Sequence, residues 1–351
     1  MAMKMAIIGF GGMGFYHYEN VSKRIDGIDV TGVWDIRPEM REKAEANGLH
    51  AYGSLDELLA DQSIGLVTIA TPNNFHKDLA IACMESGKNV ICEKPVTMNA
   101  DELREIIAVR DRTGKVFSVH QNRRWDRDYA IVREIIRSGR LGKPYYIESR
   151  VQGSRRSCDG WRGHKVNGGG MVYDWGIHLA DQLLDLFEEP VIDVYAQLYS
   201  IHNEEVDDNF KLMLKFENGV TAMIEIATNC FINQPRWHVT CVDGTAVVED
   251  WSCKGRQVKI ADDSKMAWAD EIVYTEAGPT RTMAPRPPET TEVIDLPEVN
   301  VDWCDYYKNI AAAIEGREEL IVKPEQALRV MQVIDLTFRS AAEGRSIACR
   351  I

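Results

Sequence analysis

The sequence has no long apolar run, no excess of positive charge and no paired-cysteine motif. No apolar stretch approaches the roughly 20 residues that cross a bilayer, so we expect no membrane partner. Lysine and arginine number 41 against 54 aspartates and glutamates, a net charge of −13. That balance argues against nucleic-acid and anionic-membrane partners, which need a basic surface.

The eight cysteines are scattered, and no two of them form C-x-x-C. We therefore expect free thiols in a reducing compartment and no zinc site, and we predict no metal centre. The first apolar run begins almost at residue 1, so we expect no signal peptide. Together these features predict a cytoplasmic protein, and 351 residues suffice for two domains.

A glycine-rich turn near the start of the chain carries the strongest signal. It reads Gly9, Phe10, Gly11, Gly12, Met13 and Gly14, directly after the apolar run 3–8. In a G-x-G-x-x-G dinucleotide site the glycines allow a tight turn, close approach to the pyrophosphate and close helix–strand packing. Asp35 follows 21 residues after Gly14, where a carboxylate accepts both ribose hydroxyls and repels a 2′-phosphate. The pattern predicts NAD over NADP, although Arg37 is placed to accommodate a 2′-phosphate.

Residues 1–121 alternate short apolar runs with amphipathic stretches. Strands are expected at 4–9, 28–34, 64–69, 89–92 and 116–119, and capping boxes at 54–57 and 99–102 predict helix starts. Such alternation implies parallel strands joined by right-handed crossovers. We therefore predict a Rossmann domain with a doubly wound parallel sheet.

Residues 122–351 follow a different pattern. A helix is expected at 130–138 and β-type runs at 145–151, 191–200, 208–217, 221–230, 237–243 and 245–250, with hairpin turns at Asn218-Gly219 and Asp243-Gly244. The stretch 279–297 holds five prolines and is expected to be a loop or an extended crossing. Helices are expected at 303–314 and 324–343. The prediction is an α/β domain with a large, mostly antiparallel open sheet, whose last helix can pack back on the first domain.

Two loops at the carboxyl ends of the first domain's strands carry polar groups. Ligands of doubly wound sheets bind at this edge, so Thr71, Pro72, Asn73 and His76 are expected beside the dinucleotide. Glu93-Lys94-Pro95 ends the next strand. A lysine there can stabilise the alkoxide character that develops as hydride leaves an alcohol.

A second centre lies at residues 168–181. Three glycines lead into a predicted helix whose Asp174, His178 and Asp181 share one face at i, i+4 and i+7. The expectation is that Asp174 fixes the tautomer of His178, which serves as general acid–base. A structural histidine and a metal site remain open alternatives from the residues alone. A polar loop precedes this motif, and we expect it either to contact substrate or to be solvated. Its polar residues are Arg155, Arg156, Asp159, His164 and Lys165.

These motifs, in this order, resemble the Gfo/Idh/MocA oxidoreductases. The resemblance covers 9–14, 71–76, 93–95, 122–124, 161–162 and 168–181. It implies that Lys94, Asp174 and His178 are catalytic. It also implies that Trp161 and Arg162 lie near the nicotinamide, and Asn122 and Arg123 near the cleft. The expected cofactor-binding set is residues 9–14 with Asp35, Arg37, Thr71, Pro72, Asn73, His76, Glu93, Lys94, Asn122, Trp161 and Arg162; the expected substrate set is Lys94, Arg123, Lys165, Asp174 and His178.

The activity that the resemblance implies is hydride transfer between NAD and a secondary alcohol of a sugar, inositol, polyol or glycoside. A redox-neutral enzyme that retains its NAD for epimerisation, elimination or glycoside cleavage is one alternative. A non-catalytic NAD-sensing protein is another, disfavoured by the complete set of Lys94, Asp174 and His178. The family's large sheet often packs against another subunit, so we also expect a homo-oligomer, either a dimer or a tetramer.

Overall fold

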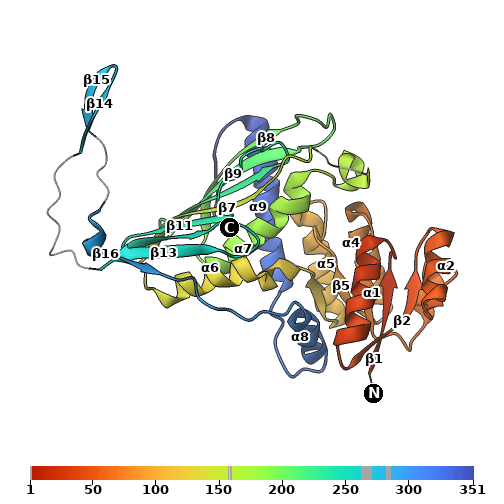
Figure 1. The fold of residues 1–351 in the computed structure, drawn as a ribbon. Coiled ribbons are helices and arrows are strands. Elements are labelled where there is room, and N and C mark those ends of the chain that lie inside the picture. Colours follow the sequence, from red (N-terminus) through yellow and green to blue (C-terminus); the bar gives the residue numbers. More distant parts are fainter. Residues whose placement is uncertain (1, 157, 159, 262–270, 282–285) are drawn as a thin grey trace.

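The computed structural model describes residues 2–156, 158, 160–261, 271–281 and 286–351. Its first sheet (Figure 1) contains β1 (Met3–Ile8), β2 (Ile28–Trp34), β3 (His50–Ala51), β4 (Leu66–Ile69), β5 (Asn89–Cys92) and β6 (Phe117–Val119). The strands are parallel, in the order β3-β2-β1-β4-β5-β6. The predicted doubly wound sheet is confirmed. Its strand order reverses between β1 and β4, where such sheets bind ligands.

Five helices accompany this sheet: α1 (Gly12–Arg24), α2 (Pro38–Ala46), α3 (Leu55–Ala60), α4 (His76–Glu85) and α5 (Ala100–Thr113). The predicted caps of α3 and α5 are confirmed, because Ser54 Oγ and Asn99 Oδ1 each accept the backbone N–H three residues on, at 3.1 and 2.9 Å. Helix α1 differs. Its N-cap residue is Gly11, which offers no side-chain cap, and its first turn has no acidic residue, so its first N–H groups are available for an anion.

The second sheet has the order β16-β13-β12-β11-β7-β10-β9-β8-β17. Its strands are β7 (Pro144–Gln152), β8 (Val191–Tyr199), β9 (Asn209–Phe216), β10 (Thr221–Ala227), β11 (Trp237–Cys241), β12 (Gly244–Val248), β13 (Gly255–Ile260), β16 (Thr291–Ile294) and β17 (Ile347–Ala348). Apart from the parallel pair β7–β10, its pairings are antiparallel, as predicted. Both predicted hairpin turns join antiparallel strands. One correction concerns the proline-rich stretch 279–297, whose described residues include most of the short strand β15 (Gly278–Arg281) and all of β16, the edge strand of this sheet.

Helices α6 (Arg127–Ser138), α7 (Ile177–Leu186) and α9 (Pro324–Glu343) lie on one side of the second sheet (Figure 1). Helix α9 also reaches the first sheet's layer, since Asp335 accepts the Ala100 N–H at the start of α5, at 3.0 Å. Helix α8 (Cys304–Ile314) packs its Tyr306 and Tyr307 into the core beneath β1. The range that the sequence assigned to the second domain therefore contributes a helix to the first.

Short helical turns carry several of the polar motifs. They are the 3-10 turns at Asn73–Phe75, Asn122–Trp125, Gly160–Gly163, Lys165–Asn167 and Pro288–Thr290, and a π-helical segment at Val172–Gly176 that runs into α7. A small separate hairpin is formed by β14 (Ile272–Thr275) and β15 (Gly278–Arg281). In the described ranges, no helix combines the length and apolar character needed to cross a membrane.

A buried ion pair joins the turn at 122–125 to α7. The Arg124 guanidinium donates to both carboxylate oxygens of Asp181, at 2.8 and 2.7 Å, and a further guanidinium nitrogen lies 3.0 Å from Asp185. Both Arg124 and Asp181 are almost fully buried. Asp181 therefore belongs to this structural pair and not to a catalytic face shared with Asp174 and His178. The i+7 spacing correctly placed Asp181 on the same helix as His178, but spacing alone could not show that Asp181 pairs with Arg124.

Replacing Asp181 by Asn should lower the free energy of unfolding by about 3 kcal/mol, because the buried Arg124 guanidinium then loses the charge of its bidentate partner and keeps only Asp185 as a counter-charge. Chemical denaturation of wild type and variant measures the difference. The matched control is Glu217→Gln, which breaks the exposed Arg350–Glu217 pair and should cost less than about 1 kcal/mol. Equal effects of the two substitutions would contradict this assignment.

Candidate active site

A cleft of about 840 Å³ runs between the carboxyl ends of β1, β4 and β5 and the segment 161–178. Most of the predicted site residues line it. They are Gly9, Gly11, Gly12, Met13, Asp35, Arg37, Thr71, Pro72, Asn73, Glu93, Lys94, Asn122, Arg123, Trp161, Arg162, Asp174 and His178. Residues from both halves of the sequence thus meet in one cavity, as the motifs predicted.

The glycine-rich turn has the shape of a phosphate cradle. Gly9 has a φ of +89°, and a Cβ there would lie 2.6 Å from the Ala70 carbonyl oxygen, so the tight turn needs glycine. A Cβ on Gly12 would meet nothing within 4 Å, which leaves open space in front of the uncapped start of α1. These residues therefore fit the pyrophosphate of a dinucleotide, held by backbone N–H groups.

Asp35 holds the turn and the end of β2 together. One of its carboxylate oxygens accepts the Phe10 N–H at 2.7 Å, and the other accepts the Arg37 N–H at 2.9 Å. The Arg37 guanidinium also donates to Asp35, at 3.3 Å, while remaining half-exposed at the cleft. The Asp35 carboxylate expected at the ribose is therefore at the cleft, but the Arg37 guanidinium lies directly beside it.

Four predicted residues do not line the cleft. Phe10 is buried in the core, and Gly14 serves packing, since a Cβ there would lie 1.9 Å from the Gly9 carbonyl oxygen. His76 is buried between two loops, with its ring nitrogens 2.9 Å from the carbonyl oxygens of Thr71 and Pro95. Lys165 is exposed on its own turn, where its N–H donates to Glu205. Phe10, Gly14 and His76 support the cofactor loops without touching the cavity.

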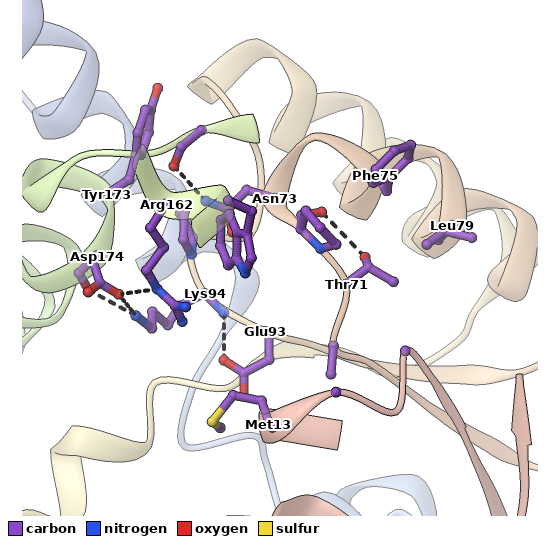
Figure 2. A pocket seen from close by; sticks show the side chains of 18 of the residues that line it. Met13, Thr71, Asn73, Phe75, Leu79, Glu93, Lys94, Arg162, Tyr173 and Asp174 are labelled. Atoms are coloured by element: carbon purple, nitrogen blue, oxygen red, sulfur yellow. Dashed lines mark hydrogen bonds and ion pairs between the residues drawn. The ribbon is translucent and has the colours of Figure 1, made fainter. Parts of the chain in front are cut away.

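Lys94 and Asp174 form the central contact of the cleft (Figure 2). The Lys94 ammonium donates to the Asp174 carboxylate at 3.1 Å and to the Asp174 backbone carbonyl at 2.9 Å. Arg162 donates to the same carboxylate oxygen, at 3.3 Å. Burial alone would raise the pKa of Asp174, but the two cations outweigh it and hold that pKa below its usual value. Asp174 is therefore an anion that fixes the position of the Lys94 ammonium.

His178 lies on the cleft wall but is not held by Asp174. Its Nδ1 is buried, and no described residue forms a hydrogen bond with that atom. The expected Asp174–His178 contact is thus wrong, because the two cations give the carboxylate stronger, charge-assisted partners. Burial, together with the charges of Lys94 and Arg123, holds the pKa of His178 well below its usual range. The imidazole is consequently neutral at pH 7.

The three glycines before this segment each permit a close approach. A Cβ on Gly168 would lie 2.7 Å from Met98 Sδ, and one on Gly169 would lie 2.1 Å from the Arg162 carbonyl oxygen. One on Gly170 would lie 2.4 Å from an oxygen of Asp207. The sequence marked this run as the entry to a helix. The structure shows that glycine is required because three other segments crowd against it.

Glu93 is the centre of a buried polar network beneath Lys94. One carboxylate oxygen lies 2.8 Å from a ring nitrogen of His17 and 2.8 Å from one of His120, and the other accepts the Lys94 N–H at 3.2 Å. Tyr307 bonds the second nitrogen of His17, at 2.6 Å. Glu93, His17 and His120 could also hold a metal ion. In the structure both histidines contact the same Glu93 oxygen, and the three residues form a network that anchors the loop bearing Lys94.

Sequence reasoning missed the aromatic part of the cleft wall. Tyr173 and Trp175, on either side of Asp174, both line the cleft. The Arg123 guanidinium lies 4.2 Å from the centre of the Trp175 ring. In the sequence, only the position of Tyr173 and Trp175 within the 168–181 motif could have indicated that they line the cleft. Of the polar loop named with Lys165, Asp159 lies outside the described residues, and Arg155, Arg156 and His164 do not line the cleft.

The family comparisons agree with this geometry. Residues 3–121 match the GFO_IDH_MocA model, described as an oxidoreductase family with an NAD-binding Rossmann fold, and residues 129–247 match the GFO/IDH/MocA C-terminal domain. A curated relative is the scyllo-inositol 2-dehydrogenase (NADP⁺) IolW of Bacillus subtilis, 28% identical over 98% of this chain and 95% of its own. Another is the uncharacterized oxidoreductase YdgJ of Escherichia coli, 30% identical over 99% of this chain and 98% of its own.

The fold is also found among solved structures. An NAD-binding protein from Listeria innocua superposes with a TM-score of 0.94 at 40% sequence identity, covering 99% of both chains. The family model is described as NAD-binding and the IolW relative is named for NADP⁺, so the cofactor class that these comparisons share is NAD(P). From the two matched domains, the full-length relatives and the Lys94–Asp174 cleft, the chain belongs to the GFO/IDH/MocA family and is an NAD(P)-dependent oxidoreductase.

Proposed function

We propose that the protein transfers hydride between NAD(P) and a secondary hydroxyl of a sugar or cyclic polyol, with an inositol as the first candidate. The observation that carries this proposal is the contact between the Lys94 ammonium and Asp174 beside a neutral His178, at the inner end of a dinucleotide cleft. The naming of the IolW relative supports the choice of a cyclic polyol. We expect it to act in the cytoplasm, where the buried thiols of Cys83, Cys92, Cys241 and Cys304 stay reduced.

The cofactor end of the cleft is built from backbone. The uncapped amides at the start of α1 would hold the pyrophosphate, and Asp35 would accept the adenosine ribose hydroxyls. When bound, the nicotinamide supplies a carbon that accepts or returns the hydride. The protein's own task is to present a hydroxyl carbon to that position and to handle the hydroxyl proton.

His178 takes the hydroxyl proton during oxidation. It is the neutral group on the cleft wall, so it can accept a proton at once, whereas a lysine ammonium must first lose one. The proton passes from the substrate oxygen to the imidazole as the C–H electron pair leaves as hydride and the carbonyl forms. Because Lys94 and Arg123 disfavour the imidazolium, His178 releases the proton readily after the step.

Lys94 stabilises the oxygen while negative charge develops on it. Asp174 fixes the ammonium through both its carboxylate and its backbone carbonyl, so the lysine does not have to be ordered during the reaction. The Glu93 carboxylate holds the Lys94 main chain from below. In the reverse direction the same positive charge polarises the carbonyl that receives hydride.

Purified Lys94→Ala and His178→Ala variants should bind NADH like the wild type but lose turnover by several hundredfold or more. Positioned acid–base groups contribute roughly 10²–10⁴ in rate, and neither side chain forms the phosphate cradle. Turnover is followed as nicotinamide reduction across a panel of inositols, free sugars, sugar acids and glycosides. NADH affinity is measured separately by calorimetry.

Two exposed residues serve as matched controls for those substitutions. Lys23→Ala removes a lysine paired with Glu19 on the surface of α1, and His50→Ala removes an exposed histidine near Glu57. Both variants should keep wild-type turnover. Wild-type rates in Lys94→Ala and His178→Ala would contradict the catalytic assignment, and no reduction of either nicotinamide with any compound of the panel would contradict the proposed reaction.

We propose that the cleft prefers NAD, and that Arg37 confers whatever activity the protein has with NADP. Asp35 opposes a 2′-phosphate, while the half-exposed Arg37 guanidinium is able to pair with one. In Arg37→Ala, kcat/KM with NADP should therefore fall by about tenfold or more, the worth of one hydrogen bond to a charged group, with little change for NAD. The control is Arg339→Ala, on the surface of α9. A wild type that favours NADP, or an Arg37→Ala variant with an unchanged NAD/NADP ratio, would refute this assignment.

We further propose that the protein is a dimer or tetramer of identical subunits. The β14–β15 hairpin stands apart from both sheets (Figure 1) and exposes Ile272, Val273 and Tyr274. An isolated two-stranded hairpin is marginally stable in water, and exposed apolar clusters mark protein interfaces. A second copy of the chain is the partner that is always present.

The oligomeric state is tested by light scattering on the eluted peak of a sizing column. Wild type should elute as a dimer or tetramer, and Val273→Glu combined with Tyr274→Glu should reduce the mass, because two carboxylates would be buried in the interface. Glu289→Lys, an exposed change outside the hairpin, is the control. A monomeric wild type would rule out the proposal, and an unchanged mass in the double variant would exclude the hairpin as the contact.

A further inference from the structure

Asp207 contacts the start of the segment 171–178, which carries Asp174 and His178, from outside the cleft. It lies in the loop between β8 and β9 and is 6% exposed. Its backbone carbonyl accepts the Met171 N–H at 3.0 Å, and its carboxylate accepts the Val172 N–H at 2.8 Å. The first N–H groups of a helix have no partner within it, so Asp207 supplies the missing acceptors.

The third glycine of the motif is shaped to this contact. Gly170 has a φ of +104°, a conformation that side-chain-bearing residues rarely adopt. A Cβ on it would lie 2.4 Å from the second carboxylate oxygen of Asp207. Two separate features of residue 170, its backbone conformation and its missing side chain, therefore bring the Asp207 carboxylate against the segment.

The segment that begins there presents Asp174 to Lys94. Residues Val172–Gly176 form a π-helical turn, and such turns recur at functional sites. The Asp174 carbonyl oxygen within this turn accepts from the Lys94 ammonium, as does the Asp174 carboxylate. The position of the first turn thus sets where both acceptors of Lys94 lie.

We propose that Asp207 is a positioning residue: by holding the N–H groups of Met171 and Val172, it fixes the π-helical turn and so places Asp174 against Lys94. The proposal rests on the proposed function for its kinetic consequence. It does not require Asp207 to touch substrate or cofactor, and Asp207 is not among the residues that line the cleft. The role adds a residue that no motif in the sequence marked.

The chain offers a close control in the next residue. Asp208 is also buried, but its carboxylate accepts N–H groups of Ile201, His202 and Asn203 in its own loop, at 2.6–3.1 Å. Asp207→Asn and Asp208→Asn are isosteric changes one residue apart that remove the same charge. A general effect of losing a buried carboxylate would be common to both variants, whereas positioning of residues 171–176 belongs to Asp207 alone.

The experiment compares three quantities in the full-length protein: kcat, the dissociation constant of NADH, and amide hydrogen exchange of the peptide covering 171–178. Asp207→Asn should lower kcat about tenfold or more and speed exchange at Val172, because an amide oxygen is a weaker acceptor for the Val172 N–H than a carboxylate oxygen is. Its NADH dissociation constant should stay within about twofold, because the phosphate cradle lies in the other half of the chain. Asp208→Asn should leave all three quantities near wild type.

Unchanged exchange at 171–178 in Asp207→Asn overturns the proposal, whether or not a substrate has been found. Loss of NADH binding together with kcat also overturns it, because that result describes general unfolding. An equal fall of kcat in both variants does so as well. If wild type turns over no compound of the panel, the proposed reaction fails, and the exchange measurement still decides whether Asp207 holds the segment.

Discussion

The contact between the Lys94 ammonium and Asp174 is the interaction on which the rest of the site depends. Its partners are 80 residues apart and come from opposite walls of the cleft. A partly buried ammonium needs a counter-charge and hydrogen-bond acceptors, or its desolvation becomes costly. Asp174 supplies both, through its carboxylate and its main chain. The same contact therefore holds the two walls of the cleft together and fixes the position of the Lys94 ammonium.

Several features elsewhere in the chain follow from that requirement. The three glycines at 168–170 let the segment bearing Asp174 pass close to the cofactor loop, to residue 162 and to Asp207. Asn73 in that loop donates to the Gly168 carbonyl, at 2.8 Å, which ties the two walls together again. On the other wall, Glu93 holds the Lys94 main chain and is itself held by His17 and His120. Each buried charge of the site has a partner that is positioned in turn.

The sequence predicted the cofactor end of the cleft better than the substrate end, for a physical reason. A phosphate cradle is made of backbone, so its requirements appear in the sequence as glycines at fixed spacing, and that spacing was readable. The pairing of Asp174 was not readable, because spacing along a helix shows which residues share a face but not which cations approach it from other segments. Asp181 illustrates the same limit, since its spacing suited the site while Arg124, which comes from another turn, gave it a structural role. Asp207 had no signal at all, as its partner segment is 35 residues away.

The net charge of the whole chain does not predict the charge of the cleft. The chain carries −13, yet the cleft is lined by four cations, Arg37, Lys94, Arg123 and Arg162, and only three carboxylates, Asp35, Glu93 and Asp174. Charges act over about 8 Å at physiological ionic strength, so a ligand responds to the cleft lining and not to the whole surface. An acidic total therefore argues against nucleic acid, which covers a wide surface, but says nothing against an anionic dinucleotide. The local excess of positive charge, together with the backbone cradle, makes an acidic protein suited to a doubly phosphorylated cofactor.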